Sequence, residues 1–249
     1  MKPYLFAIAT AAAAQHKPRI AAVGDSITEG ACSSDESKYS WPVKLANMLT
    51  RGDGTSDYEV KNFGVSGRTS LRKGDFPYWV EPKYQEAKDY QPQIVIIMFG
   101  TNDSKIYQWN QDDFVTDYSD LINSFIQLES RPDVYVMVPP PLYQEGAYAM
   151  DMHVINEVFP SLIPQIADHT GAKGIPTFDF LGGSKLEAWE LFCDDQNCDA
   201  CHPNDAGYEY LAARIYGQLF GKPMPQSGDV MLENPKLKVW RIGEDVQFI

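Results

Sequence analysis

Basic side chains are scarce in this sequence relative to acidic ones. Twenty-one lysine and arginine residues stand against 34 aspartate and glutamate residues, which gives a formal net charge of −13 at pH 7. A surface with this excess of negative charge repels nucleic acid and anionic lipid headgroups. We therefore expect neither nucleic acid nor a membrane surface as a partner, and the sequence leaves the oligomeric state open.

An apolar run long enough to cross a bilayer, about 20 residues, is also missing. The most apolar N-terminal stretch is short: Lys2 precedes it, and the small residues Ala12, Ala13 and Ala14 follow it. This pattern is typical of a cleaved signal peptide. We expect residues 1–14 to be that peptide and the mature protein to be exported, whether secreted, periplasmic or in the secretory-pathway lumen.

Internal repeats and low-complexity tracts are absent outside this alanine-rich leader. A chain of 249 residues fits one large α/β domain better than two small ones, and we place that domain at residues 15–221. The regular pattern ends there. In the tail, residues 222–249, Val239–Ile242 and Val246–Ile249 are spaced for a β-hairpin, to which we assign no function.

Short apolar runs alternate with amphipathic segments along the domain. Alternation of this kind predicts a parallel, doubly wound sheet with helices on both faces, a three-layer α/β/α sandwich of about five strands. The expected strands are Ile20–Val23, Tyr58–Phe63, Ile94–Phe99, Val134–Val138 and Thr177–Phe180. The expected helices begin at Trp41 and run over Glu81–Tyr90, Asp112–Leu128, Asp151–His169 (bent at its prolines) and Asn204–Phe220.

The first expected strand ends in Gly24-Asp25-Ser26. Open α/β sheets bind their ligands at the carboxyl ends of the strands, so Ser26 is a candidate nucleophile. The alternative is that Ser26 only caps the next helix, as serine often does. The choice depends on whether later turns supply a base and hydrogen-bond donors.

Histidine is rare, with four residues in the chain. Three of them, His16, His153 and His169, have no candidate partner nearby in the sequence. His202 lies in a polar loop before the last helix, three residues after Asp199. A serine nucleophile needs a base, and the base needs an orienting carboxylate. His202 and Asp199 are the candidates, although both could be ordinary polar loop residues.

A serine nucleophile that attacks a carbonyl group also needs donors for the developing oxyanion. Gly67 lies in a flexible turn after the second strand, and Asn102, with a side-chain NH₂ group, follows the third strand. With the Ser26 backbone N–H they make three candidate donors. Taken singly, each also fits a plain turn role.

Cysteine is limited to Cys32, Cys193, Cys198 and Cys201, which allow three full disulfide pairings. We favour Cys193–Cys198 and Cys32–Cys201 in an exported protein. A competing interpretation uses Cys198, Cys201 and His202 as a Cys-x-x-Cys-His haem attachment, or adds Cys193 to make a Cys₃His zinc site. Either alternative would take His202 away from Ser26.

Four blocks of this sequence, taken in order, resemble the SGNH hydrolase (GDSL esterase/lipase) superfamily. The matching blocks are Gly24–Gly30, Asn62–Gly67, Gly100–Asp103 and Asp199–Asn204, with Ile27 in place of the leucine of the GDSL name. The resemblance implies a flavodoxin-like α/β/α fold and ester hydrolysis without metal or cofactor. It further implies Ser26, His202 and Asp199 as catalytic residues, and Ser26, Gly67 and Asn102 as the oxyanion hole.

Three segments look similar to exported members that remove O-acetyl groups from carbohydrates, such as sialate or xylan acetylesterases. They are Asn62–Trp79, Gly100–Ser104 and Pro139–Pro141. Aromatic rings able to stack on sugars, a basic side chain for a carboxylate and the acid beside the nucleophile are the candidate substrate contacts. They are Asp25, Arg68, Tyr78, Trp79, Tyr107, Trp109 and Tyr143. The alternatives are a lipase or thioesterase, an acyltransferase, and a non-catalytic glycan-binding domain.

Overall fold

Five parallel strands form the centre of the fold in the computed structural model, which describes residues 17–192 and 199–221. Their order across the sheet is β2-β1-β3-β4-β5, and every neighbouring pair is parallel. The strands are β1 (Arg19–Gly24), β2 (Glu59–Gly64), β3 (Ile94–Met98), β4 (Asp133–Met137) and β5 (Lys173–Ile175). The predicted five-stranded, doubly wound α/β sheet is confirmed.

The sheet divides the core into two layers because successive strand residues point to opposite faces. On β1, Ala21 and Val23 pack into one buried cluster, and Ile20 and Ala22 pack into the other. All four side chains are inaccessible to solvent. A strand covered on both faces explains why its sequence is continuously apolar rather than alternating.

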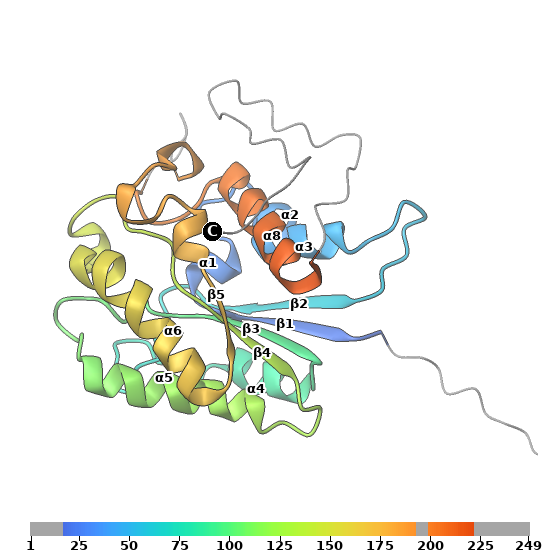
Figure 1. The fold of residues 1–249 in the computed structure, drawn as a ribbon, viewed down its shortest axis with the longest axis horizontal. Coiled ribbons are helices and arrows are strands. Elements are labelled where there is room, and N and C mark those ends of the chain that lie inside the picture. Colours follow the sequence, from blue (N-terminus) through green and yellow to red (C-terminus); the bar gives the residue numbers. More distant parts are fainter. Residues whose placement is uncertain (1–16, 193–198, 222–249) are drawn as a thin grey trace, which may run out of the picture.

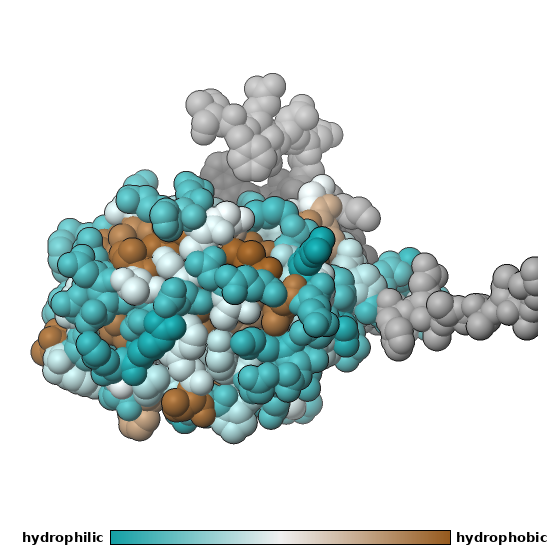
Figure 2. Space-filling view, turned by 90° about the horizontal axis from the view of Figure 1, so that it is seen from below, coloured by the Kyte–Doolittle hydropathy of each residue, from teal (hydrophilic) through white to brown (hydrophobic). Residues whose placement is uncertain are grey.

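Helices cover both faces of the sheet (Figure 1). On one face lie α3 (Trp41–Met48) and α8 (Asp205–Phe220), and on the other lie α4 (Pro82–Asp89), α5 (Gln111–Ile126) and α6 (Phe159–Thr170). Four of them, α3, α4, α5 and α8, confirm predicted helices to within a few residues, and α6 forms the second part of the helix predicted at Asp151–His169. The outer surface seen from below is mostly hydrophilic, with separate hydrophobic patches (Figure 2).

The remaining helical segments are short. They are α1 (Ser26–Glu29), α2 (Glu36–Tyr39), α7 (Thr177–Phe180), the 3-10 turns η1 (Tyr78–Val80), η2 (Ala147–Ala149), η4 (Gly183–Lys185) and η5 (Trp189–Leu191), and the π turn η3 (Val154–Val158). The predicted long helix at Asp151–His169 is therefore divided: η3 leads into α6, whose first turn accommodates Pro160.

One strand prediction is wrong. Thr177–Phe180 forms the helical turn α7, and the fifth strand is Lys173–Ile175, just before it. Pro176 separates the two segments, and proline has no N–H with which to continue a strand ladder. The apolar side chains of Ile175, Phe178 and Leu181 are all buried nonetheless, which is why the stretch resembled one strand.

The predicted signal peptide at residues 1–14 and the predicted hairpin in residues 222–249 lie outside the described residues. Within residues 17–192 and 199–221, no helix has the length and apolar content needed to cross a membrane.

Candidate active site

The turn after β1 is shaped by Gly24 and Asp25. A Cβ on Gly24 would lie 2.2 Å from Thr28 Oγ1 and 2.6 Å from the Met98 carbonyl oxygen, so the chain can turn this tightly only at glycine. Asp25 is the N-cap of α1 and accepts the Ile27 N–H at 3.0 Å. Because Asp25 performs the capping, the Ser26 hydroxyl is left for another partner.

That partner is His202. The Ser26 Oγ lies 2.7 Å from His202 Nε2, and His202 Nδ1 lies 2.5 Å from Asp199 Oδ2. Asp199 also accepts the backbone N–H groups of Cys201 at 3.0 Å and His202 at 2.8 Å through its other oxygen. The loop thus folds back on itself, and the structure brings the three predicted residues into one hydrogen-bonded chain.

The hydrogen-bonded chain is largely removed from water, since Ser26 is 6% and His202 is 7% exposed. Burial lowers the pKa of His202, but the hydrogen bond and charge of Asp199, together with Cys32, raise it by more. Burial alone would raise the pKa of Asp199, yet its bonds to His202 hold that pKa well below the usual range. The pair therefore favours a proton on the imidazole.

Three of the strand ends meet at this place. The strand order puts β1 between β2 and β3, and the chain leaves β1 and β3 toward opposite faces of the sheet. Such a switch point opens a crevice at the carboxyl ends of the strands. Ser26 follows β1, Gly67 follows β2 and Asn102 follows β3, so all three candidate donors belong to loops at this edge.

Asn102 is 4% exposed, and its Nδ2 group donates to Asp25 Oδ2 at 3.4 Å and to the Arg68 carbonyl at 3.2 Å. Gly67 has a φ of +79°, a conformation that favours glycine. A Cβ at Gly67 would meet no atom within 4 Å. Glycine is favoured there by its backbone conformation and not by a lack of room, because the residue faces open space.

Sequence reasoning missed the residues that hold this turn in place. The Glu29 carboxylate accepts the Ser66 N–H at 2.8 Å and also the Ser66 hydroxyl. Arg68 donates to the Ser66 carbonyl at 2.7 Å and to Glu81 at 2.8 Å. These bonds join the turn beside Gly67 to the helix that begins at Ser26. The sequence feature that could have revealed these contacts is Glu29, the acidic residue three positions after Ser26.

A family model described as GDSL-like lipase/acylhydrolase matches residues 22–210, which contain all of the groups just described and four of the five strands in full, with the second half of β1. The chain belongs to the GDSL-like lipase/acylhydrolase family. The predicted family is thereby confirmed.

Among curated proteins, this family member is similar to an acetylxylan esterase from Xylanibacter ruminicola, with 31% identity over 215 residues. The alignment covers 79% of this chain and 42% of that protein. The chain thus spans about two fifths of the length of the curated relative it matches.

Solved structures of other esterases share the fold. A two-domain esterase active on acetylated mannans superposes with a TM-score of 0.60 at 21% identity, covering 84% of this chain and 52% of that one. A carbohydrate acetylesterase from Sinorhizobium meliloti has a TM-score of 0.59 at 20% identity, covering 82% and 98%. An acetylxylan esterase from Geobacillus stearothermophilus has a TM-score of 0.61 at 17% identity, covering 84% and 97%.

Several residues that were predicted to bind substrate make contacts within the fold of this family member instead. Asp25 is fully buried and cannot touch substrate. Tyr78 is also buried, with its hydroxyl on the Phe63 carbonyl at 2.7 Å. Trp109 packs against two core phenylalanines, each with its ring centroid 5.3 Å away. The prediction that Asp25 and Tyr78 bind substrate is wrong, because both side chains are buried, whereas the half-buried Trp109 stays a predicted contact.

The other residues that were predicted to bind substrate differ in the contacts that they make within the protein. Trp79 donates its Nε1–H to the Ser70 carbonyl at 2.8 Å. The Tyr143 hydroxyl donates to the Leu181 carbonyl and accepts the Ala188 N–H, each at 3.0 Å. The Arg68 guanidinium is bound to Glu81. Tyr107, 63% exposed, presents most of its ring to solvent while its hydroxyl donates to Asp75.

The predicted Cys32–Cys201 disulfide is absent from the structure. The Cys32 thiol donates to Asp199 Oδ2 at 3.0 Å, whereas the buried Cys201 thiol contacts the Met150 sulfur at 3.8 Å. The two sulfurs thus have separate surroundings, one polar and one apolar. The other half of that prediction, Cys193–Cys198, lies outside the described residues.

Metal or haem ligation by His202 does not fit the geometry. Both of its ring nitrogens are hydrogen-bonded, one to Ser26 and one to Asp199, so neither is left for iron or zinc. Cys32, Asp199 and His202 do place one ligand atom each within 4.8 Å of one another. Those atoms are the ones that form the hydrogen-bonded chain and its thiol neighbour.

Proposed function

We propose that this protein is a serine esterase that removes acetyl groups from carbohydrates through a covalent acyl-enzyme. One observation carries the proposal: Ser26 Oγ, His202 and Asp199 form a continuous hydrogen-bonded chain at the switch point of the sheet. This order of hydroxyl, imidazole and carboxylate is the arrangement that activates a serine nucleophile.

In the first step Ser26 Oγ attacks the acetyl carbonyl carbon while His202 Nε2 takes the hydroxyl proton. Asp199 stabilises the imidazolium that results, and the raised pKa of His202 reflects the same interaction. The negative charge that develops on the carbonyl oxygen is received by the N–H groups of Ser26, Gly67 and Asn102. When the intermediate collapses, His202 passes its proton to the sugar oxygen, which departs as an alcohol.

In the second step water replaces the sugar. His202, neutral again, removes a proton from the water as its oxygen attacks the acetyl carbon on Ser26. The same three donors hold the second oxyanion. Collapse breaks the bond to Ser26 Oγ, returns the proton from His202 to that oxygen, and releases acetate.

The choice of acetylated carbohydrate is supported by the relatives, which act on acetylated xylan and mannan according to their names. On this chain, Tyr107 offers an exposed ring for a sugar. Export, which the N-terminal sequence predicts, would bring the enzyme to such polysaccharides. An acyltransferase would use the same acyl-enzyme with a sugar hydroxyl instead of water.

Hydrolysis of p-nitrophenyl acetate by Ser26→Ala tests the mechanism, and we expect kcat to fall by at least about 10³-fold. Ser124→Ala on α5, which removes a hydroxyl bonded only to its own helix at Leu121, is the matched control and should keep wild-type kcat. Acetate release from acetylated xylan and mannan oligosaccharides, compared with long-chain esters, tests the substrate class. Near wild-type turnover by Ser26→Ala would refute the mechanism.

A further inference from the structure

Five hydrogen-bond donors surround the Asp199 carboxylate. Two are the backbone N–H groups of Cys201 and His202 on Oδ1, and the third is the His202 imidazole on Oδ2. The other two come from distant parts of the chain and also reach Oδ2. They are the Cys32 thiol and the Tyr148 hydroxyl, each at 3.0 Å. Sequence reasoning assigned no role to Tyr148.

The backbone around Asp199 is held in unfavourable conformations. Left-handed φ values occur at Cys32 (66°), Tyr148 (53°), Ala149 (61°) and Ala200 (62°). These are four of the seven non-glycine residues with positive φ in the described residues. Residues with a Cβ adopt such values only where the surrounding structure fixes them, and they gather at functional sites.

Tyr148 covers the solvent side of the site. Its ring meets the His202 ring edge-on, with centroids 5.9 Å apart and an interplanar angle of 75°. Tyr148 itself is 56% exposed, whereas the His202 and Asp199 side chains beneath it are nearly buried. Burial and the Asp199 charge raise the pKa of Tyr148 to about 12, so its hydroxyl keeps the proton that it donates.

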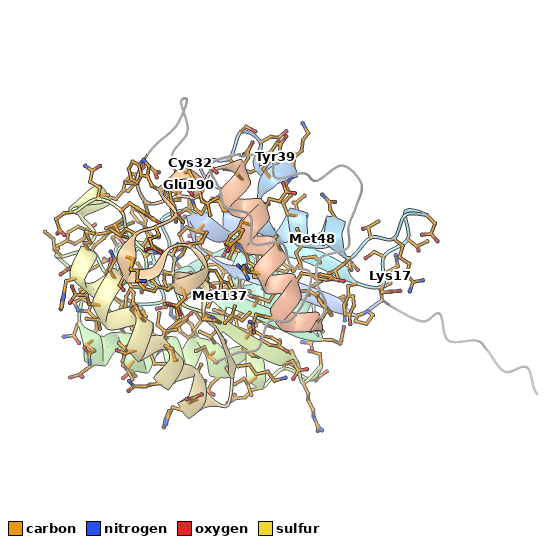
Figure 3. The ribbon with its side chains drawn as sticks, turned by 45° about the horizontal axis from the view of Figure 1, so that its top comes forward. Lys17, Cys32, Tyr39, Met48, Met137 and Glu190 are labelled. Carbon is orange, nitrogen blue, oxygen red and sulfur yellow. The ribbon has the colours of Figure 1, made fainter. Side chains whose placement is uncertain are left out.

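The segment that carries Tyr148 is tied to the loop that carries Asn102. The Ala149 carbonyl accepts the Ile106 N–H at 3.0 Å, and Asp151 donates to the Ser104 carbonyl at 3.1 Å. Cys32 lies near the start of α8 (Figure 3), where Tyr208 donates to the Ala31 carbonyl at 2.7 Å. Asp199 therefore accepts hydrogen bonds from two segments that are each anchored to other parts of the fold.

We propose that Tyr148 and Cys32 are positioning residues, whose donors fix the Asp199 carboxylate so that His202 is held toward Ser26. The inference rests on the proposed function. Because the Tyr148 hydroxyl shares Oδ2 with the imidazole, it reduces the negative charge that His202 experiences. Losing this donor leaves more charge for the imidazolium, so the pH at which His202 becomes a base rises. Losing either donor leaves less constraint on the carboxylate, so kcat falls.

The test is the pH profile of kcat/KM for p-nitrophenyl acetate in Tyr148→Phe, Cys32→Ala and Cys32→Ser. The phenylalanine keeps the covering ring and removes only the donor, and the serine keeps a donor in place of the thiol. Tyr90→Phe is the matched control, since the Tyr90 hydroxyl donates at 3.2 Å to the Glu59 carbonyl at the start of β2. Asp25 and Cys201, the other titratable groups that act on the site, are unchanged throughout.

We expect Tyr148→Phe and Cys32→Ala to lower kcat by roughly tenfold with little change in KM. The acidic limb of Tyr148→Phe should move to higher pH and that of Cys32→Ala should not, because Cys32 itself raises the pKa of His202. Cys32→Ser and Tyr90→Phe should follow the wild type in both kcat and pH profile. An unmoved acidic limb in Tyr148→Phe, with or without lost kcat, would overturn the proposal. Ser26→Ala is measured in the same series to separate failure of this proposal from failure of the proposed function. Activity that survives in Ser26→Ala would refute the esterase mechanism itself.

Discussion

Replacing Asn102 with alanine removes one oxyanion donor and very little else. The Asn102 Nδ2 group is bound at 3.4 Å to Asp25 and at 3.2 Å to the Arg68 carbonyl, both at the long end for hydrogen bonds. Losing them should lower the free energy of unfolding by only about 1–2 kcal/mol. Long bonds also leave the amide able to turn toward a stronger acceptor, the oxyanion.

The kinetic effect should be larger than the effect on stability. Loss of one preorganised oxyanion donor typically costs about 2.7–4 kcal/mol of barrier, or about 10²–10³-fold in kcat. The interaction exists only when the oxygen is charged, so KM should change little. The measurements are kcat and KM for p-nitrophenyl acetate, and urea unfolding of the same preparation.

Asn156→Ala is the contrasting variant. Asn156 is also buried, but both of its amide bonds, each 2.8 Å long, go to the Leu142 backbone. It should lose more unfolding free energy than Asn102→Ala and keep kcat near the wild-type value. If folded Asn102→Ala retained kcat within about tenfold of wild type, Asn102 would not belong to the oxyanion hole.

Two further predictions concern pH. His202 must be neutral to accept the Ser26 proton, and its raised pKa should place the acidic limb of kcat/KM above the ordinary value of 6.5; a midpoint below 6.5 would contradict this. Burial raises the pKa of Asp103 from 3.8 to about 6, so its contribution to stability is full below pH 3.8 and lost as pH rises through about 6. Urea unfolding should show that Asp103→Asn raises the free energy of unfolding by about 1–3 kcal/mol at pH 8 and leaves it unchanged at pH 4. Equal gains at both pH values would refute the raised pKa of Asp103.

The sequence was most informative where a residue type is demanded by local chemistry. A continuous apolar run such as Ile20–Val23 has to be a buried strand, and the polar turns after such strands have to lie at one edge of a parallel sheet. Ser26, His202 and Asp199 could be placed together on that reasoning, supported by the family blocks. The structure shows them in contact.

Prediction failed where the outcome depends on packing between distant segments. Tyr78 is buried in the core, and no local pattern reveals this, because an aromatic residue suits a sugar site and a core equally well. Tyr148 escaped notice because its role depends on a left-handed backbone turn that aims it at Asp199, 51 residues away. The pairing of Cys32 with Cys201 was predicted from the number and positions of the cysteines in the sequence, whereas the position of Cys32 beside Asp199 depends on the fold.

The nucleophile follows the first strand, and its base precedes the last helix, 176 residues later. A nascent chain that ends before α8 therefore contains Ser26 but no partner able to activate it. On the proposed mechanism, ester cleavage can therefore begin only after the ribosome has released nearly the whole domain and α8 has docked. Any truncation from the carboxyl side that removes this helix is expected to silence the enzyme even if the earlier strands still associate.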